Sequence, residues 1–119
     1  MGNKIVHIEF MGADGAGQEK FYSDIFGWDT EEVPGFNHYY MVSEESAGQT
    51  AAVGQGPEES PSYLTVYVEV ESIDDHLAKI ADAGGQTIMP RTVVPDVITF
   101  AMFADPAGNV VGLTEAGSG

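Results

Sequence analysis

The sequence predicts an α+β fold in which a strand–helix–three-strand (βαβββ) module occurs twice. Residues 4–11 and 63–70 alternate between apolar and polar side chains, which indicates half-buried strands. Each is followed by a helical apolar pattern, over 16–26 and 73–83. One such module cannot bury its sheet alone. We therefore expect two paired modules that form an open cup of mixed sheet with the helices outside.

The first strand of the first module has two chemically different faces. Val6, Ile8 and Phe10 lie on one face, and His7 and Glu9 lie on the other. Because side chains alternate across a strand, the apolar set should face a core and the polar pair should look into the cup.

The rest of the first module, about residues 4–55, follows from local signals. Asp14 is a suitable cap for the helix over 16–26, and Gly27 should end it in the left-handed conformation. We expect a turn over 44–48 and three strands, over 28–33, 38–43 and 49–55.

The second module, about residues 62–115, repeats the plan. Ser72 should cap the helix over 73–83. A strand over 86–89 and a loop over 90–95 should precede a β-hairpin over 99–115, whose turn is Asp105–Asn109. The inward residues of its first strand are predicted to be Leu64, Val66, Val68 and Val70.

Composition indicates a single domain over 1–119, with a Pro- and Gly-containing linker over 56–61. There is no cysteine, so a disulfide framework and a thiolate metal site are excluded. No apolar run is long enough to span a membrane and no signal peptide is evident, so we expect a cytoplasmic protein.

The net charge of −15, from 19 acidic and 4 basic residues, limits the partners. Nucleic acids and anionic membrane surfaces need Lys or Arg, so we expect neither as a partner. The acid excess indicates either an ordinary solvated surface or adaptation to high salt.

Four segments carry a resemblance to a known family. They are residues 6–10 (Val-His-Ile-Glu-Phe), 21–28 (Phe-Tyr-x-x-Ile-Phe-Gly-Trp), 83–85 (Ala-Gly-Gly) and 105–109 (Asp-Pro-Ala-Gly-Asn), with Gly112 and Glu115 after the last. With them the chain resembles the vicinal oxygen chelate superfamily, which includes glyoxalases, bleomycin resistance proteins and dioxygenases. These are turn and packing motifs, so they bear on fold more than on chemistry.

The resemblance also implies four strand positions that hold metal ligands in the family's enzymes. They fall on His7, near Gly54 with Gln55 adjacent, on Thr65 and on Gly112. Only His7 is a good ligand, whereas a divalent metal needs about three protein ligands. We therefore expect no metal site and no cofactor.

His7 and Glu9 are the candidate catalytic residues. They could act as an acid–base pair, with Glu9 orienting His7. The alternative is that two polar residues face a hydrated concave surface and bond to each other.

An aromatic pocket is the candidate ligand site, and the residues that could line it are Tyr63, Tyr67, Tyr39 or Tyr40, Phe100, Met102 and Trp28. The alternative is ordinary packing or a dimer interface. Gly54 and Gly112 could leave room there for an organic molecule, or could relieve close strand contacts. The predicted ligand-binding residues are His7, Glu9, Tyr40, Gly54, Thr65, Tyr67, Phe100, Met102 and Gly112.

Two classes of function fit these observations. The first is a small-molecule binding protein that uses the aromatic cup without a complete metal site. The alternative is a glyoxalase- or dioxygenase-like enzyme, a lyase, isomerase or oxygenase, with a degenerate metal site or with acid–base catalysis by His7 and Glu9. In either case unprotected strand edges predict a homodimer.

Overall fold

The structure, a computed structural model, describes residues 2–59 and 61–116. The chain divides into two compact units. We call residues 7–65 the amino-terminal unit, and residues 2–6 with 66–116 the carboxy-terminal unit. Ser60, within the predicted linker, lies outside the described residues. The prediction of a single domain over 1–119 stays a prediction.

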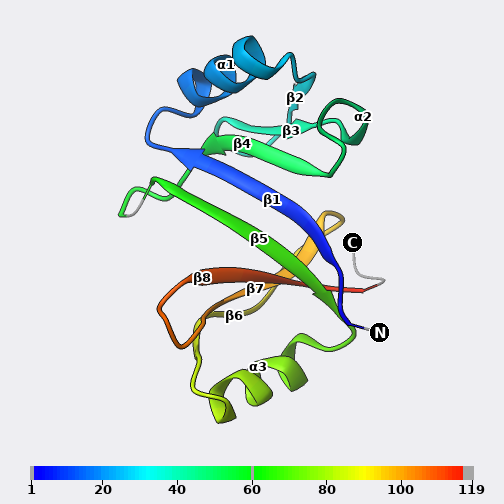
Figure 1. Cartoon of the computed structure of the whole chain (residues 1–119), viewed down its shortest axis with the longest axis vertical. Helices are drawn as coiled ribbons and strands as arrows, with labels where there is room; N and C mark the ends of the chain where they lie inside the picture. The colour runs from blue at the N-terminus through cyan, green and yellow to red at the C-terminus, as the bar shows by residue number, and fades with distance from the viewer. Residues whose placement is uncertain (1, 60, 117–119) are drawn as a thin grey trace. The chain divides into compact units, whose positions relative to one another are not determined.

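The amino-terminal unit combines a mixed sheet with one long helix (Figure 1). Its strands follow the order β2-β3-β4-β1, in which β1 and β4 are parallel and the other pairs are antiparallel. The strands are β1 (Ile5–Gly12), β2 (Thr30–Glu32), β3 (Tyr39–Val42) and β4 (Ala51–Gln55), and the helices are α1 (Gly15–Phe26) and the one-turn α2 (Glu44–Ala47).

The ends of α1 are fixed by the predicted residues. The Asp14 carboxylate accepts a hydrogen bond from the Gly17 N–H at 3.0 Å, and Gly27 takes a φ of 70° that favours glycine. The core beneath the helix consists of Val42, Ala51 and Val53. Partly buried apolar side chains pack around this core, among them Ile8, Phe10, Tyr22, Trp28 and Tyr40.

The carboxy-terminal unit has the same plan (Figure 1). Its strands follow the order β5-β8-β7-β6, with β5 and β8 parallel and the other pairs antiparallel. The elements are β5 (Tyr63–Val70), α3 (Ile73–Asp82), β6 (Gln86–Val94), β7 (Ile98–Ala104) and β8 (Val110–Glu115). The α+β class and the mixed strand pairing are confirmed, as is the hairpin of β7 and β8.

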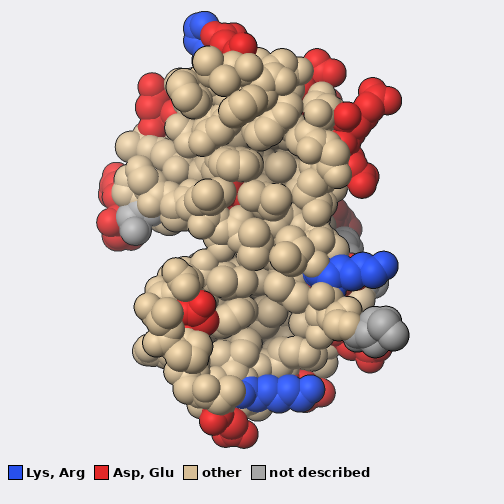
Figure 2. Space-filling model, in the orientation of Figure 1, with Lys and Arg blue, Asp and Glu red and all other residues tan. Residues whose placement is uncertain are grey.

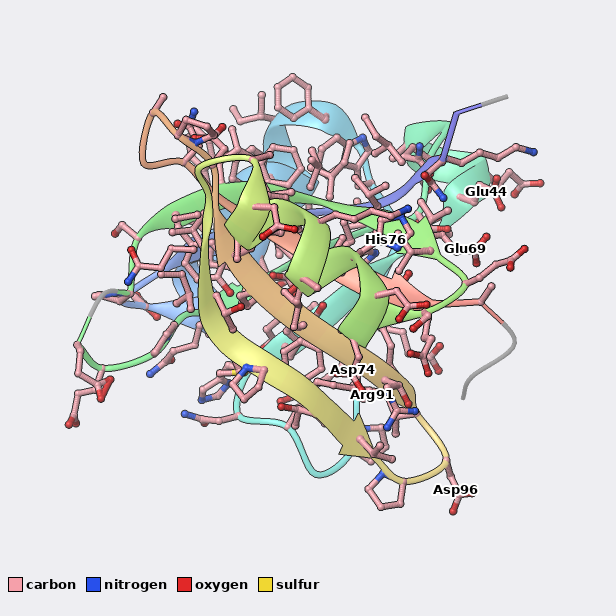
Figure 3. All side chains as sticks on the ribbon, turned by 90° about the horizontal axis from the view of Figure 1, so that it is seen from below. Glu44, Glu69, Asp74, His76, Arg91 and Asp96 are labelled. Carbon is pink, nitrogen blue, oxygen red and sulfur yellow. The ribbon has the colours of Figure 1, made fainter. Side chains whose placement is uncertain are left out.

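The start of α3 is held by residues from three elements. Ser72 Oγ accepts a hydrogen bond from the Asp75 N–H at 3.2 Å, and Glu115 Oε2 accepts one from the Ile73 N–H at 3.0 Å. Arg91 Nη2 donates to Glu115 Oε1 at 2.7 Å and lies beside Asp74 (Figure 3). This hydrogen bonding lowers the pKa of Glu115 and raises that of Arg91. The strand end thus caps the helix with a carboxylate that stays ionised.

Three sequence-based expectations differ from the structure. The loop predicted over 90–95 is largely strand, because β6 runs to Val94. Pro90 is tolerated there since β6 is the last strand in the order, and the pairing with β7 shifts register on either side of Met89. The turn over 44–48 contains α2, capped by Ser43. Leu64 is 67% exposed, because the core under α3 includes Val68 and Val70 but not the start of the strand.

Candidate ligand-binding site

Strand register brings a polar set of side chains onto the face of the amino-terminal sheet that lies opposite α1. Met11 of β1 pairs with Gly54 of β4, and Gly54 pairs with Tyr39 of β3. Since paired residues share a face and side chains alternate along a strand, His7 and Glu9 share the face of Tyr39. Ile8 and Phe10 lie on the helix side, as predicted from the alternation.

The centre of this face is a hydrogen-bonded group that we call the Glu9 cluster: His7, Glu9, Tyr39 and Tyr63. Glu9 is only 5% exposed. Its Oε2 accepts a hydrogen bond from the Tyr39 hydroxyl at 2.6 Å, and its Oε1 accepts one from the Tyr63 hydroxyl at 3.1 Å. His7 Nε2 lies 3.1 Å from the Tyr39 oxygen and 4.0 Å from Glu9 Oε2. The cluster therefore gives a buried carboxylate two donors, which offsets the cost of removing its charge from water.

The bonding fixes where the protons lie. Tyr39 has one hydroxyl proton, and it goes to Glu9. The Tyr39 oxygen can then only accept from His7, so His7 carries its proton on Nε2. Burial lowers the pKa of His7, although the charge of Glu9 partly opposes this. Burial and the neighbouring Glu9 raise the pKa of Tyr63. The lowered pKa of His7 favours a neutral imidazole, and the raised pKa of Tyr63 keeps that phenol protonated.

A cavity of about 490 Å³ opens beside the cluster, and Tyr39 belongs to both. The Phe36 ring lies 5.6 Å from the Tyr39 ring, centroid to centroid. The described residues that line the cavity all belong to the amino-terminal unit: Ala13, Phe36, Asn37, Tyr39, Gln55, Gly56, Pro57, Glu58 and Pro61. The lining combines two aromatic rings with the polar side chains of Asn37, Gln55 and Glu58, and rings beside convergent polar groups are found in small-molecule sites.

Two other surface cavities lack the combination of aromatic rings and contact with the Glu9 cluster. One of about 600 Å³ near α2 is lined by several carboxylates without an aromatic ring, and one of about 450 Å³ runs along the surface of α3. Neither includes a member of the Glu9 cluster. The cavity at Tyr39 is therefore the better candidate.

The other predicted site residues of the amino-terminal unit have different surroundings. Tyr40 lies on the helix side of β3, against the core of Val42 and Val53. A Cβ on Gly54 would collide with the backbone of residues 38 and 39, which favours the close-contact interpretation over room for a ligand. Thr65 is buried, with 5% of its surface exposed.

The remaining predicted residues belong to the carboxy-terminal unit. Gly112 pairs with Tyr67 on one side and with Met102 on the other, and Phe100 shares their face. The Tyr67 ring occupies the space that a Cβ on Gly112 would need. The sheet therefore brings these four residues together, and Tyr67 fills the gap at Gly112.

The sequence did not indicate that Tyr39 and Tyr63 join His7 and Glu9 in one hydrogen-bonded cluster. Tyr39 and Tyr40 are adjacent, and nothing in their strand indicates which one shares the face of Glu9. The strand register identifies Tyr39 as the cluster member, because Tyr39 is the cross-strand neighbour of Gly54 and so shares the face of Glu9. Phe36, which lines the cavity, was not predicted as a site residue, because it lies in the segment between β2 and β3 and reaches the cavity only through tertiary packing.

The side chains do not fit the metal site that the resemblance implies. His7 and Glu9 are both hydrogen-bonded to Tyr39, and Gly54 and Gly112 offer no side-chain donor. Among residues 2–59 and 61–116, no three His, Asp or Glu side chains are grouped as a metal ion would require. A neutral Thr65 hydroxyl and one imidazole are a weak set for a divalent ion.

The family model for the Glyoxalase/Bleomycin resistance protein/Dioxygenase superfamily matches residues 4–113. The chain belongs to this superfamily, which confirms the resemblance seen in the sequence. The described helices include none long and apolar enough to cross a membrane.

Two curated relatives are each 30% identical to the chain. One is the "Putative glyoxylase CFP32" of Mycobacterium tuberculosis, over 115 residues that cover 92% of this chain and 44% of the relative. The other is the "Anthracycline biosynthesis protein DnrV" of Streptomyces peucetius, covering 80% of this chain and 40% of the relative. The chain thus spans less than half the length of these relatives.

Solved structures share the fold at low identity. Methylmalonyl-CoA epimerase from Mycobacterium tuberculosis is 14% identical, with a TM-score of 0.67 and coverage of 93% of this chain and 86% of that one. At this identity the likeness shows the fold alone.

Proposed function

We propose that this chain is a small-molecule binding protein that holds an organic ligand in the cavity beside the Glu9 cluster, without the family's usual metal site. One observation carries the proposal: Tyr39 lines the cavity and is fixed from behind by its hydrogen bond to buried Glu9. A ring that is already ordered loses little conformational entropy when a ligand packs on it.

The dimensions and chemistry of the cavity support binding rather than simple surface roughness. Its volume of about 490 Å³ falls in the range of small-molecule sites. Phe36 and Tyr39 offer apolar area, and Asn37 and Gln55 offer hydrogen-bonding groups that can orient a ligand. Gln55 is itself positioned, since its Oε1 accepts from the Gly15 N–H at 3.2 Å.

The alternative function is catalysis by the same cluster, as a lyase, isomerase or oxygenase of the glyoxalase type. Supporting it is the proton chain from His7 Nε2 through the Tyr39 hydroxyl to Glu9. A neutral imidazole is suited to take up a proton from a bound substrate. The relative's name, a glyoxylase, and the epimerase among the similar structures belong to this class.

We also propose that the chain acts as a cytoplasmic homodimer. The acidic, cysteine-free composition suits that compartment. The end strand β6 exposes Ile88, Met89 and Val93, and a row of exposed apolar residues on an edge strand is commonly covered by another chain.

A fragment screen by NMR tests the binding proposal. The screen records amide and aromatic shifts of the isotope-labelled chain while small organic fragments are added. We expect hits to perturb Phe36, Tyr39 and Gln55, and Phe36→Ala to weaken them. Tyr40→Phe is the matched control, because Tyr40 lies on the helix side of the same strand. Hits confined to α3 or to β7 would contradict the proposal.

The fragments that bind in this screen also distinguish a binding protein from an enzyme. A fragment whose carbon-bound hydrogen exchanges with deuterium in the presence of the protein, but not with His7→Gln, would favour catalysis. Binding without exchange would favour the binding protein.

A further inference from the structure

We infer that the ligand of the Tyr39 cavity is an aromatic organic cation and that the cavity discriminates against anions. This inference rests on the proposed function and specifies its ligand class. It follows from the charges of the lining, the rings that form its wall and the carboxylate behind them.

The described lining contains one charged side chain, the carboxylate of Glu58, and no Lys or Arg. Lys20 is the one Lys or Arg in the sequence from 7 to 65, and its Nζ is bonded to Asp24 Oδ2 at 2.6 Å on the exposed side of α1. An anion entering the cavity would lose water without gaining a basic partner. A carboxylate, phosphate or thioester of a phosphorylated carrier is therefore disfavoured.

A cation meets three favourable features at the same place. Phe36 and Tyr39 line the cavity with ring centroids 5.6 Å apart, and an aromatic ring attracts positive charge at its face through the ring quadrupole. Glu58 supplies an opposite charge at the lining. Glu9 adds a buried negative charge one hydrogen bond behind Tyr39. Because Glu9 is buried, water screens its charge less than the charge of Glu58, which is exposed.

The acidic surface as a whole could attract any cation weakly. Acidic side chains (red) are spread over the visible face of the molecule, and basic ones (blue) are few (Figure 2). At 0.15 M salt, however, exposed charges act only over about 8 Å. The inference therefore predicts a local effect of Glu58 that a distant carboxylate does not share, and this makes it testable.

The test uses three probes with one ring system and three charges: 2-(aminomethyl)naphthalene, 2-naphthalenemethanol and 2-naphthoate. Each is titrated into the labelled chain at pH 7 and 0.15 M salt, with shifts of Phe36 and Tyr39 as the readout. We expect the cation to bind tightest, the alcohol more weakly and the anion not measurably. Phe36→Ala should weaken both the cation and the alcohol, because each packs on that ring.

Glu58→Gln isolates the charge. We expect it to weaken binding of the cation by about two- to five-fold and to leave binding of the alcohol unchanged, as the loss of one exposed ion pair does. Glu31→Gln is the charge-matched control, because Glu31 lies on β2, outside the cavity lining. It should leave all three probes unchanged.

The outcomes separate the two proposals. If the anion binds as tightly as the cation, or if Glu58→Gln and Glu31→Gln act alike, the charge inference is wrong and the binding site stands. If none of the three probes moves Phe36 or Tyr39, the proposed function fails, and the inference fails with it.

Discussion

At the residue scale, the Glu9 cluster shows how a carboxylate can be stabilised in a buried position. An isolated buried carboxylate costs several kcal/mol unless donors replace its water. Here two phenol hydroxyls do so, at 2.6 and 3.1 Å. No buried side-chain nitrogen or oxygen among the described residues lacks a hydrogen-bond partner. The cluster therefore orients Tyr39 without leaving a polar atom unsatisfied.

Removing the Tyr39 hydroxyl should destabilise the protein. Tyr39→Phe takes the closest donor from Glu9 and the acceptor from His7, so we expect the free energy of unfolding to fall by about 1–3 kcal/mol. Urea denaturation measures the change. Tyr40→Phe is the control, because the Tyr40 hydroxyl makes only an exposed contact with His38 at 3.3 Å, and it should leave the midpoint almost unchanged. Equal losses in both variants would contradict this account.

The lowered pKa of His7 predicts how stability depends on pH. Below pH 6.5, the ordinary pKa of histidine, His7 becomes protonated in the unfolded chain, whereas in the folded protein it stays neutral until a lower pH. His7 therefore contributes its full stability above pH 6.5, and that contribution is lost as the pH falls from 6.5 through the folded pKa. We expect urea midpoints to fall over this range in the native protein and less steeply in His7→Gln.

His76→Gln provides the control for this titration. His76 lies on α3, with its Nδ1 bonded to the carbonyl of Ser72 and apart from the Glu9 cluster. The variant should keep the steep fall of the native protein. An unchanged slope in His7→Gln would show that other groups set the acid sensitivity.

At the element scale, periodicity predicted the helices and most strands, because each rests on a local pattern with caps at its ends. The failures have a common cause. Pro90 indicated a loop, but an edge strand can accept a residue without an N–H. Likewise, two adjacent tyrosines on β3 left the cluster member undecided until the register with Gly54 fixed it. Local chemistry could predict the pair of His7 and Glu9, but not the side chains that complete the cluster from other segments.

The glycine of β8 gives a prediction about strand packing. The Tyr67 ring lies where a Cβ on Gly112 would stand, so Gly112→Ala must displace an aromatic side chain. We expect the free energy of unfolding to fall by about 1–3 kcal/mol, the usual cost of overpacking. Gly2→Ala is the control, since nothing lies within 4 Å of a Cβ there. Unchanged stability in Gly112→Ala would mean that Tyr67 moves freely and that space for a ligand exists beside it.

At the scale of the whole molecule, the two units repeat one plan but carry different chemistry. The polar cluster and the cavity belong to the amino-terminal unit. The carboxy-terminal unit presents Tyr67, Phe100 and Met102 on one sheet face. In this unit the carboxylate of Glu115 caps the start of α3. The predicted site residues were thus a mixture of two sets, and only the amino-terminal set includes a histidine and a carboxylate. A sequence pattern with a twofold repeat does not indicate which module forms the polar cluster.

The edge of the second sheet leads to the last prediction, on assembly. Strand β6 ends the order and exposes Ile88, Met89 and Val93, at 52%, 41% and 54% of their surfaces. Exposed apolar residues on an edge strand favour pairing with another chain. We expect light scattering at micromolar concentrations to give twice the chain mass of 12.6 kDa, and Val93→Lys to shift the protein toward monomer. Ile25→Lys, on the exposed side of α1, should leave the dimer intact. A monomeric mass for the native protein at every concentration would overturn the dimer, whereas dissociation by Ile25→Lys alone would move the interface from β6 to the helix.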